Sequence, residues 1–296
     1  MHDPQKILND IARANFHKGG LKTARLFKVE PDFFRRVREE VLRFVALHRP
    51  SDVQGTEHVT NWTKPFGSVF QFSLLNRSGR VDDTSSDHEL SLDGKRFHFG
   101  EEFPALGAFV AAFPHAINMR LNAMGEKGGL SPHEEHPLRY RTARDCWLTA
   151  RFHLPVVTNP AVEVLLDGEL FRLEEGSVFF FNNGCIHSAV NRGENVRYHL
   201  VWDMLLTRET YELMFAESEG DLPPFLRRTS GAERVPAAHR REPIREYQTY
   251  GRGLDLYKKW DLGRFGVPAY RFQNLYTSWR FLKHQLRESV DFYQGT

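Results

Sequence analysis

Apolar and polar residues alternate with a period of two through the middle of the chain, which indicates β-strands. In the run 148–154, Leu-Thr-Ala-Arg-Phe-His-Leu, this alternation places Arg151 and His153 on one face. Asp167-Gly168 separates two such runs, as in a tight hairpin. Further runs of this kind lie at 21–29, 66–75, 116–122, 162–166, 169–173, 177–181, 186–190 and 196–203. Short strands without intervening helices predict a mainly β, antiparallel core of the jelly-roll (cupin-like, double-stranded β-helix) kind.

Helical spacing of apolar residues is found instead toward the two ends of the chain and in one central segment. The expected helices lie at 4–17, 31–45 and 103–113, after Thr207, and over much of 244–296. Two organisational units follow, a β core with N-terminal helices over 1–206 and a helical C-terminal region over 207–296. Residues 225–242 are basic and contain prolines, which suggests a linker or substrate lid, whereas the acidic stretch 80–93 is expected to be an exposed loop.

Composition limits the classes of protein that need to be considered. The chain has 296 residues, 41% of them hydrophobic, and 24 are Phe, so a single large core rich in aromatic residues is expected. The net charge of +2 gives no indication of a nucleic-acid or membrane partner. Two cysteines and no run of about 18 apolar residues favour a cytoplasmic protein without a disulfide framework.

Four residues between 131 and 203 have the pattern of an iron centre. His133 and Glu135 lie two apart on an extended segment, and His187 follows a glycine, an apolar strand and a turn. Two histidines and one carboxylate on one face are the ligand set of many non-haem Fe(II) oxygenases. Arg197, ten residues after His187, is expected to point inward, where a buried guanidinium suits a carboxylate of a co-substrate.

These segments resemble the aspartyl/asparaginyl β-hydroxylase family of Fe(II)/2-oxoglutarate dioxygenases over roughly 116–206. The matching pieces are Ser-Pro-His133, Arg151-Phe-His153-Leu-Pro, the Asp167-Gly168-Glu169 hairpin, Glu175-Gly176, Phe181, His187 and Arg197. The resemblance also extends to bacterial free-proline hydroxylases. It implies Fe(II), 2-oxoglutarate and O2 as cofactor and co-substrates. It further implies His133 and His187 as iron ligands, Arg197 as the 2-oxoglutarate anchor, and Arg151, His153 and Asn122 as co-substrate contacts.

Two points of the ligand set stay open in the sequence. Proline-hydroxylase relatives have Asp where this chain has Glu135, and some β-hydroxylases have no carboxylate there, so Glu135 is either the third ligand or a neighbouring group that holds a metal-bound water. The spacing from His133 to Arg151 is longer than in most relatives, which leaves His136 as a rival ligand.

The expected activity is hydroxylation of an unactivated C–H bond of an amino-acid-type substrate, free, within a peptide or on a carrier, with conversion of 2-oxoglutarate to succinate. The alternatives are a halogenase or a lipid hydroxylase on the same core, and a cupin-like binding module without catalysis. The sequence does not indicate an oligomeric state.

Overall fold

The fold is that of a computed structural model, which describes residues 21–49, 69–87, 89–133, 135, 138–140, 146–166, 169–185, 187–215, 222–233, 239–240 and 259–265. The helix expected at 4–17, His136 and the greater part of the helical region expected at 244–296 lie outside these residues.

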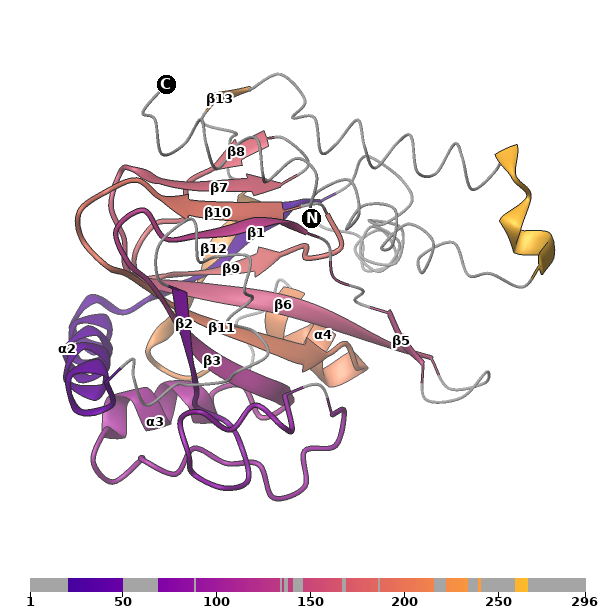
Figure 1. The fold of residues 1–296 in the computed structure, drawn as a ribbon. Helices are drawn as coiled ribbons and strands as arrows, with labels where there is room; N and C mark the ends of the chain where they lie inside the picture. The colour runs from indigo at the N-terminus through magenta and orange to yellow at the C-terminus, as the bar shows by residue number, and fades with distance from the viewer. Residues whose placement is uncertain are drawn as a thin grey trace.

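Two antiparallel sheets form the core (Figure 1). The larger sheet has the strand order β12-β1-β9-β6-β11-β3-β2, with the short strand β5 paired to β6. Its strands are β1 (Thr23–Val29), β2 (Val69–Ser73), β3 (Ala116–Met124), β5 (Leu138–Tyr140), β6 (Cys146–Val157), β9 (Ser177–Phe181), β11 (Arg197–Leu205) and β12 (Leu226–Glu233). The smaller sheet has the order β13-β8-β7-β10-β4. Its strands are β4 (Gly129–His133), β7 (Val162–Leu166), β8 (Glu169–Phe171), β10 (His187–Asn191) and β13 (His239–Arg240).

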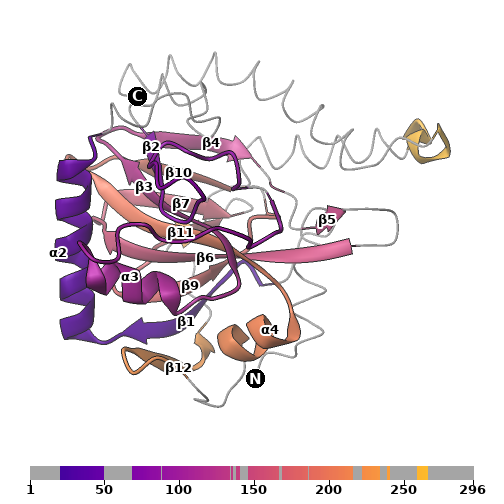
Figure 2. The ribbon, with the colours of Figure 1, turned by 90° about the horizontal axis from the view of Figure 1, so that it is seen from below.

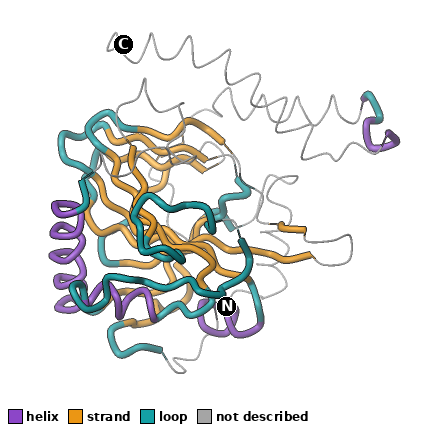
Figure 3. Tube along the Cα trace, turned by 60° about the horizontal axis from the view of Figure 1, so that its bottom comes forward, coloured by secondary structure: helices purple, strands orange, loops and turns teal. Residues whose placement is uncertain are grey.

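Three helices pack against the larger sheet on the side away from the smaller sheet (Figures 2 and 3). These helices are α2 (Pro31–Leu47), α3 (Pro104–Ala111) and α4 (Arg208–Phe215). A 3₁₀ turn lies at Leu262–Phe265. The Glu30 carboxylate caps α2 by accepting the backbone N–H groups of Asp32 and Phe33. Trp202 of β11 is fully buried here and contacts the rings of Phe109 and Phe152.

Most elements expected from the hydrophobic pattern are confirmed, and so is the mainly β jelly-roll core. The interpretation of 225–242 as a linker or lid is wrong for its first half, because β12 is a strand of the larger sheet paired with β1. The acidic stretch 80–93 lacks regular structure, as expected, but part of it is buried, including Asp87. Within the described ranges, no helix is both long enough and apolar enough to cross a bilayer.

Candidate active site

The inner face of the larger sheet is polar although it is buried. Phe179 and Phe181 on β9 pack against the apolar residues of β7 and β8, so their face is the one that looks toward the smaller sheet. Arg151 lies opposite Phe181, and His153 lies opposite Phe179, which places both on the same face. The expectation that Arg151 and His153 share one face is therefore confirmed, and that face points toward the smaller sheet.

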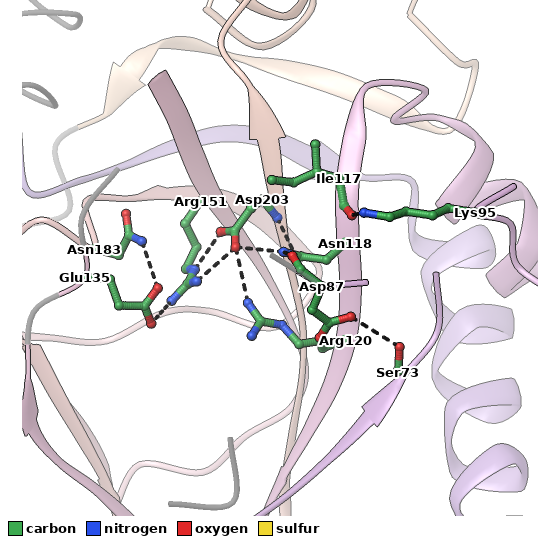
Figure 4. Close-up of polar contacts among 10 residues, drawn as sticks. All are labelled: Ser73, Asp87, Lys95, Ile117, Asn118, Arg120, Glu135, Arg151, Asn183 and Asp203. Carbon is green, nitrogen blue, oxygen red and sulfur yellow. Dashed lines mark hydrogen bonds and ion pairs between the residues drawn. The ribbon is translucent and has the colours of Figure 1, made fainter. Parts of the chain in front are cut away.

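Paired charges occupy one end of this face (Figure 4). Asp203 stands between Asn118 and Arg151 in the strand register. Its carboxylate accepts Nε and Nη2 of Arg151 at 2.7 and 3.0 Å, Nδ2 of Asn118 at 3.0 Å and Nη2 of Arg120 at 3.3 Å. Burial opposes ionisation of Asp203, but the charge of Arg151 outweighs it and lowers the pKa of the carboxyl to about 2.

Glu135 joins the same cluster from the segment after β4. Arg151 donates Nη1 to Oε1 of Glu135 at 2.5 Å, and Asn183 donates Nδ2 to Oε2 at 3.2 Å. Burial works against the charge on Arg151, yet Asp203 and Glu135 together raise its pKa above the ordinary value. The contacts with Arg151 and Asn183 orient the Glu135 carboxylate, which lies just after the strand that carries His133.

Arg197 lies on the same inner face, toward the other end, and has no carboxylate partner in the described part of the chain. It is 2% exposed, its Nη2 donates to Nδ1 of His199 at 2.7 Å, and its Nε has no hydrogen-bond partner. Desolvation lowers its pKa to about 9, so the guanidinium remains charged at neutral pH. Asp203 does not pair with Arg197, because its carboxylate binds Arg151 and Arg120.

Several buried polar atoms around Arg197 also lack hydrogen-bond partners among the described residues. They are both ring nitrogens of His153, Nε2 of His199, Oδ1 of Asn122 and Oε1 of Gln71. Gln71, Asn122 and His199 are direct neighbours across β2, β3 and β11. Native interiors rarely leave so many polar atoms unsatisfied, and a bound polar ligand is the ordinary explanation when they do.

The two buried histidines of this region are neutral. Desolvation comes first and the charge of Arg197 second in holding the pKa of His153 and of His199 well below the usual range. His153 stacks on Phe181, with ring centroids 4.5 Å apart, and Phe181 meets the ring of His187 edge-on at 5.2 Å. A continuous row of rings therefore runs from His187 to His153 and on to His199, 6.0 Å away.

The strand register brings the two expected iron ligands together. His187, the first residue of β10, is the direct partner of His133, the last residue of β4. His187 is 6% exposed, and its Nδ1 lies 2.8 Å from the backbone oxygen of Cys185. A hydrogen bond between Nδ1 and a backbone oxygen is the arrangement in which the Nε2 of a histidine commonly serves as the metal ligand. The side chain of His133 is outside what the structure describes, and no three His, Cys, Asp or Glu side chains converge among those that are described.

A family comparison agrees with this geometry. The model of the family described as aspartyl/asparaginyl beta-hydroxylase matches residues 35–206, more than half of the chain. The chain belongs to the aspartyl/asparaginyl β-hydroxylase family. As a member, it is a 2-oxoglutarate-dependent hydroxylase that uses Fe(II), 2-oxoglutarate and O2 and acts on a small molecule or peptide. No curated protein matches the chain.

The solved structures that resemble this β-hydroxylase have low sequence identity and low TM-scores to it. A non-heme monooxygenase solved as a nickel complex is 11% identical, with a TM-score of 0.33, covering 79% of this chain and 89% of the other. A Pseudomonas putida prolyl-4-hydroxylase is 14% identical, with a TM-score of 0.32, covering 67% and 96%. An oxidoreductase of the 2OG-Fe(II) oxygenase family from Burkholderia pseudomallei is 17% identical, with a TM-score of 0.25, covering 46% and 66%.

The residues of this β-hydroxylase fit the iron and co-substrate of its family. His187 is the backbone partner of His133 across β10 and β4, and the Glu135 carboxylate follows β4. A buried guanidinium with no carboxylate partner among the described residues lies farther along the same interior. Sequence reasoning missed Asp203, Gln71 and the position of His199 beside Arg197. The period of two on β11 placed His199 and Asp203 on the face of Arg197, which was the available signal.

Proposed function

We propose that the protein hydroxylates an unactivated C–H bond of an amino-acid-type substrate, free, within a peptide or on a carrier, while 2-oxoglutarate becomes succinate and CO2. The observation that supports this most is the buried guanidinium of Arg197. An unpaired buried charge is destabilising unless a ligand neutralises it. A dicarboxylate co-substrate supplies that counter-charge.

In this proposal His133, His187 and Glu135 hold the iron, which supplies the chemistry with O2 that couples decarboxylation of the co-substrate to C–H hydroxylation. Arg197 binds the distal carboxylate of 2-oxoglutarate through its free N–H groups. The neutral rings of His153 and His199 and the amide of Asn122 surround the co-substrate and exclude water. Arg151 faces the end nearer the iron ligands.

The role of Glu135 follows from its two oxygens. Oε1 is held by Arg151 and Oε2 by Asn183. A carboxylate has about four lone-pair sites, so it can accept hydrogen bonds and bind a metal at the same time. They also orient the group, as the partners of metal-binding carboxylates generally do. Glu135 is therefore proposed as the third ligand, with an ordering role for a metal-bound water as the alternative.

The test is a succinate-release screen of the Fe(II)-loaded protein across free amino acids and small peptides, with the product mass recorded. A substrate should stimulate succinate formation and gain the mass of one oxygen atom. Arg197→Ala should abolish both signals. A protein that forms no succinate from 2-oxoglutarate under any condition would instead be the binding module without catalysis.

The remaining expectations about partners and location rest on sequence alone. We propose a cytoplasmic protein, from the cysteine content, that binds neither nucleic acid nor membrane, from the near-neutral net charge. Fractionation of cells that produce the protein, followed by immunoblotting, tests the location.

A further inference from the structure

Arg151 is held in place by a carboxylate that belongs to neither the iron ligands nor the co-substrate contacts. Asp203 accepts Nε and Nη2 of Arg151 with its two oxygens, at 2.7 and 3.0 Å. Two parallel N–H···O bonds fix the plane of a guanidinium as well as its position. The side chains of Arg151 and Asp203 are 8% and 9% exposed, so solvent screens this pair little.

Asp203 is itself fixed from the neighbouring strand. Asn118 donates Nδ2 to its Oδ2 at 3.0 Å, and the Oδ1 of Asn118 accepts the backbone N–H of Asp203 at 3.1 Å. Arg120 adds a longer contact at 3.3 Å (Figure 4). These bonds run from β3 through β11 to β6, so the larger sheet itself holds Arg151 by its Nε and Nη2.

Glu135 contacts Arg151 from the opposite side and in a different manner. It accepts one N–H, from Nη1, and its side chain is 28% exposed, compared with 9% for Asp203. The contacts with Asp203 and Glu135 engage three of the five N–H groups of a guanidinium. Two N–H groups, one on each Nη, remain for a ligand.

We propose that Asp203 is a positioning residue for co-substrate binding: it fixes Arg151 so that its free N–H groups face the carboxylate of 2-oxoglutarate nearer the iron. This inference rests on the proposed function, since it assumes that Arg151 contacts the co-substrate. Asp203 touches neither metal nor co-substrate and acts only through Arg151. Asn118 positions Arg151 indirectly, because it holds the carboxylate and the backbone of Asp203.

Calorimetric titration of 2-oxoglutarate into the Mn(II)-loaded full chain, without turnover, tests this. Asp203→Asn should raise the Kd for 2-oxoglutarate about 10- to 100-fold, as loss of a partner that orients a ligand commonly does, and leave the Kd for Mn(II) unchanged. The matched control is Asp87→Asn, another buried aspartate, near Arg120 but without contact to Arg151. It should change the Kd for 2-oxoglutarate by less than about twofold.

A second variant covers the case in which Asp203→Asn does not fold, as judged by circular dichroism. Asn118→Ala should raise the Kd for 2-oxoglutarate in the same direction but less. An unchanged Kd in whichever of the two variants folds overturns the inference, as does an equal effect of Asp87→Asn. If the wild-type protein binds no 2-oxoglutarate, or Arg197→Ala binds it normally, the proposed function fails instead.

Discussion

Arg197 donates an N–H group to Nδ1 of His199 over 2.7 Å, and no carboxylate in the described part of the chain pairs with this guanidinium. The bond fixes the tautomer of His199, since a nitrogen that accepts carries no proton, so the hydrogen lies on Nε2. Two buried donors, Nε of Arg197 and Nε2–H of His199, therefore have no acceptor among the residues that the structure describes. A bound anion would accept a hydrogen bond from each of them.

Replacing Arg197 by Met should weaken binding of 2-oxoglutarate without lowering the stability of the folded chain. We expect the Kd for 2-oxoglutarate to rise about 30-fold or more, because truncating a buried charged partner costs at least about 2 kcal/mol. Without 2-oxoglutarate, the free energy of unfolding should not fall, since the change removes an unpaired buried charge. Titration calorimetry and urea unfolding measure the two quantities. A large loss of stability with normal binding would make Arg197 a structural residue.

Both histidines of the β10–β4 pair, His133 and His187, should be needed for metal binding. His133→Ala and His187→Ala are each expected to weaken Mn(II) binding by at least about 100-fold, more than loss of an outer partner does, because each removes a direct ligand. Electron paramagnetic resonance of free and bound Mn(II) gives the affinity. His115→Ala, in the turn before β3, is the control and should bind Mn(II) as the wild type does. Normal Mn(II) binding by His187→Ala would remove the basis for the iron site.

The role of Glu135 as a metal ligand can be tested by comparing its loss with the loss of Asn183, which orients it. We expect Glu135→Gln to weaken Mn(II) binding about tenfold or more, and Asn183→Ala to weaken it less, because the second variant keeps the carboxylate and its contact with Arg151. The same titrations with 2-oxoglutarate present show which ligand each change affects. Unchanged Mn(II) affinity in Glu135→Gln would mean that this carboxylate serves Arg151 alone.

Asp87 should make stability depend on pH in the direction opposite to most carboxylates. Burial raises its pKa from 3.8 to about 6. The folded chain then binds a proton more readily than the unfolded chain, so this group stabilises the protein below about pH 4 and loses that contribution as the pH rises to about 6. We expect Asp87→Asn to be more stable than the wild type at pH 7, by up to about 3 kcal/mol, and this advantage to disappear near pH 4. Urea unfolding across this range measures it, and a pH-independent difference would contradict the assignment.

The period of two predicted the face of each strand but not the partners on that face. It placed Arg151 and His153 on one face and Arg197 inward, and the structure agrees for all three. It could not tell that Asp203 pairs with Arg151 and not with Arg197, because that depends on the register between β6 and β11, which are distant in sequence.

Strand β12 shows a different limit of the sequence. Its arginines, Ser and Gly give weak strand propensity, and its partner β1 lies about 200 residues earlier in the chain. Edge strands are commonly charged, since charge discourages pairing with other molecules, so polar composition did not exclude a strand here. The flanking prolines favoured a linker on local grounds, whereas long-range pairing decided the outcome.

Because Arg197 has no carboxylate partner in the described part of the chain, the concentration of the co-substrate should also affect how long the protein survives in the cell. A ligand that binds only the folded chain stabilises it in proportion to the logarithm of its concentration, by about 2.7 kcal/mol at one hundred times the Kd. Because no carboxylate among the described residues pairs with Arg197, the protein without bound co-substrate is the form that unfolds more readily. Resistance to proteolysis should therefore rise and fall with the supply of the 2-oxo acid, so that abundance of the protein follows the metabolite that it consumes.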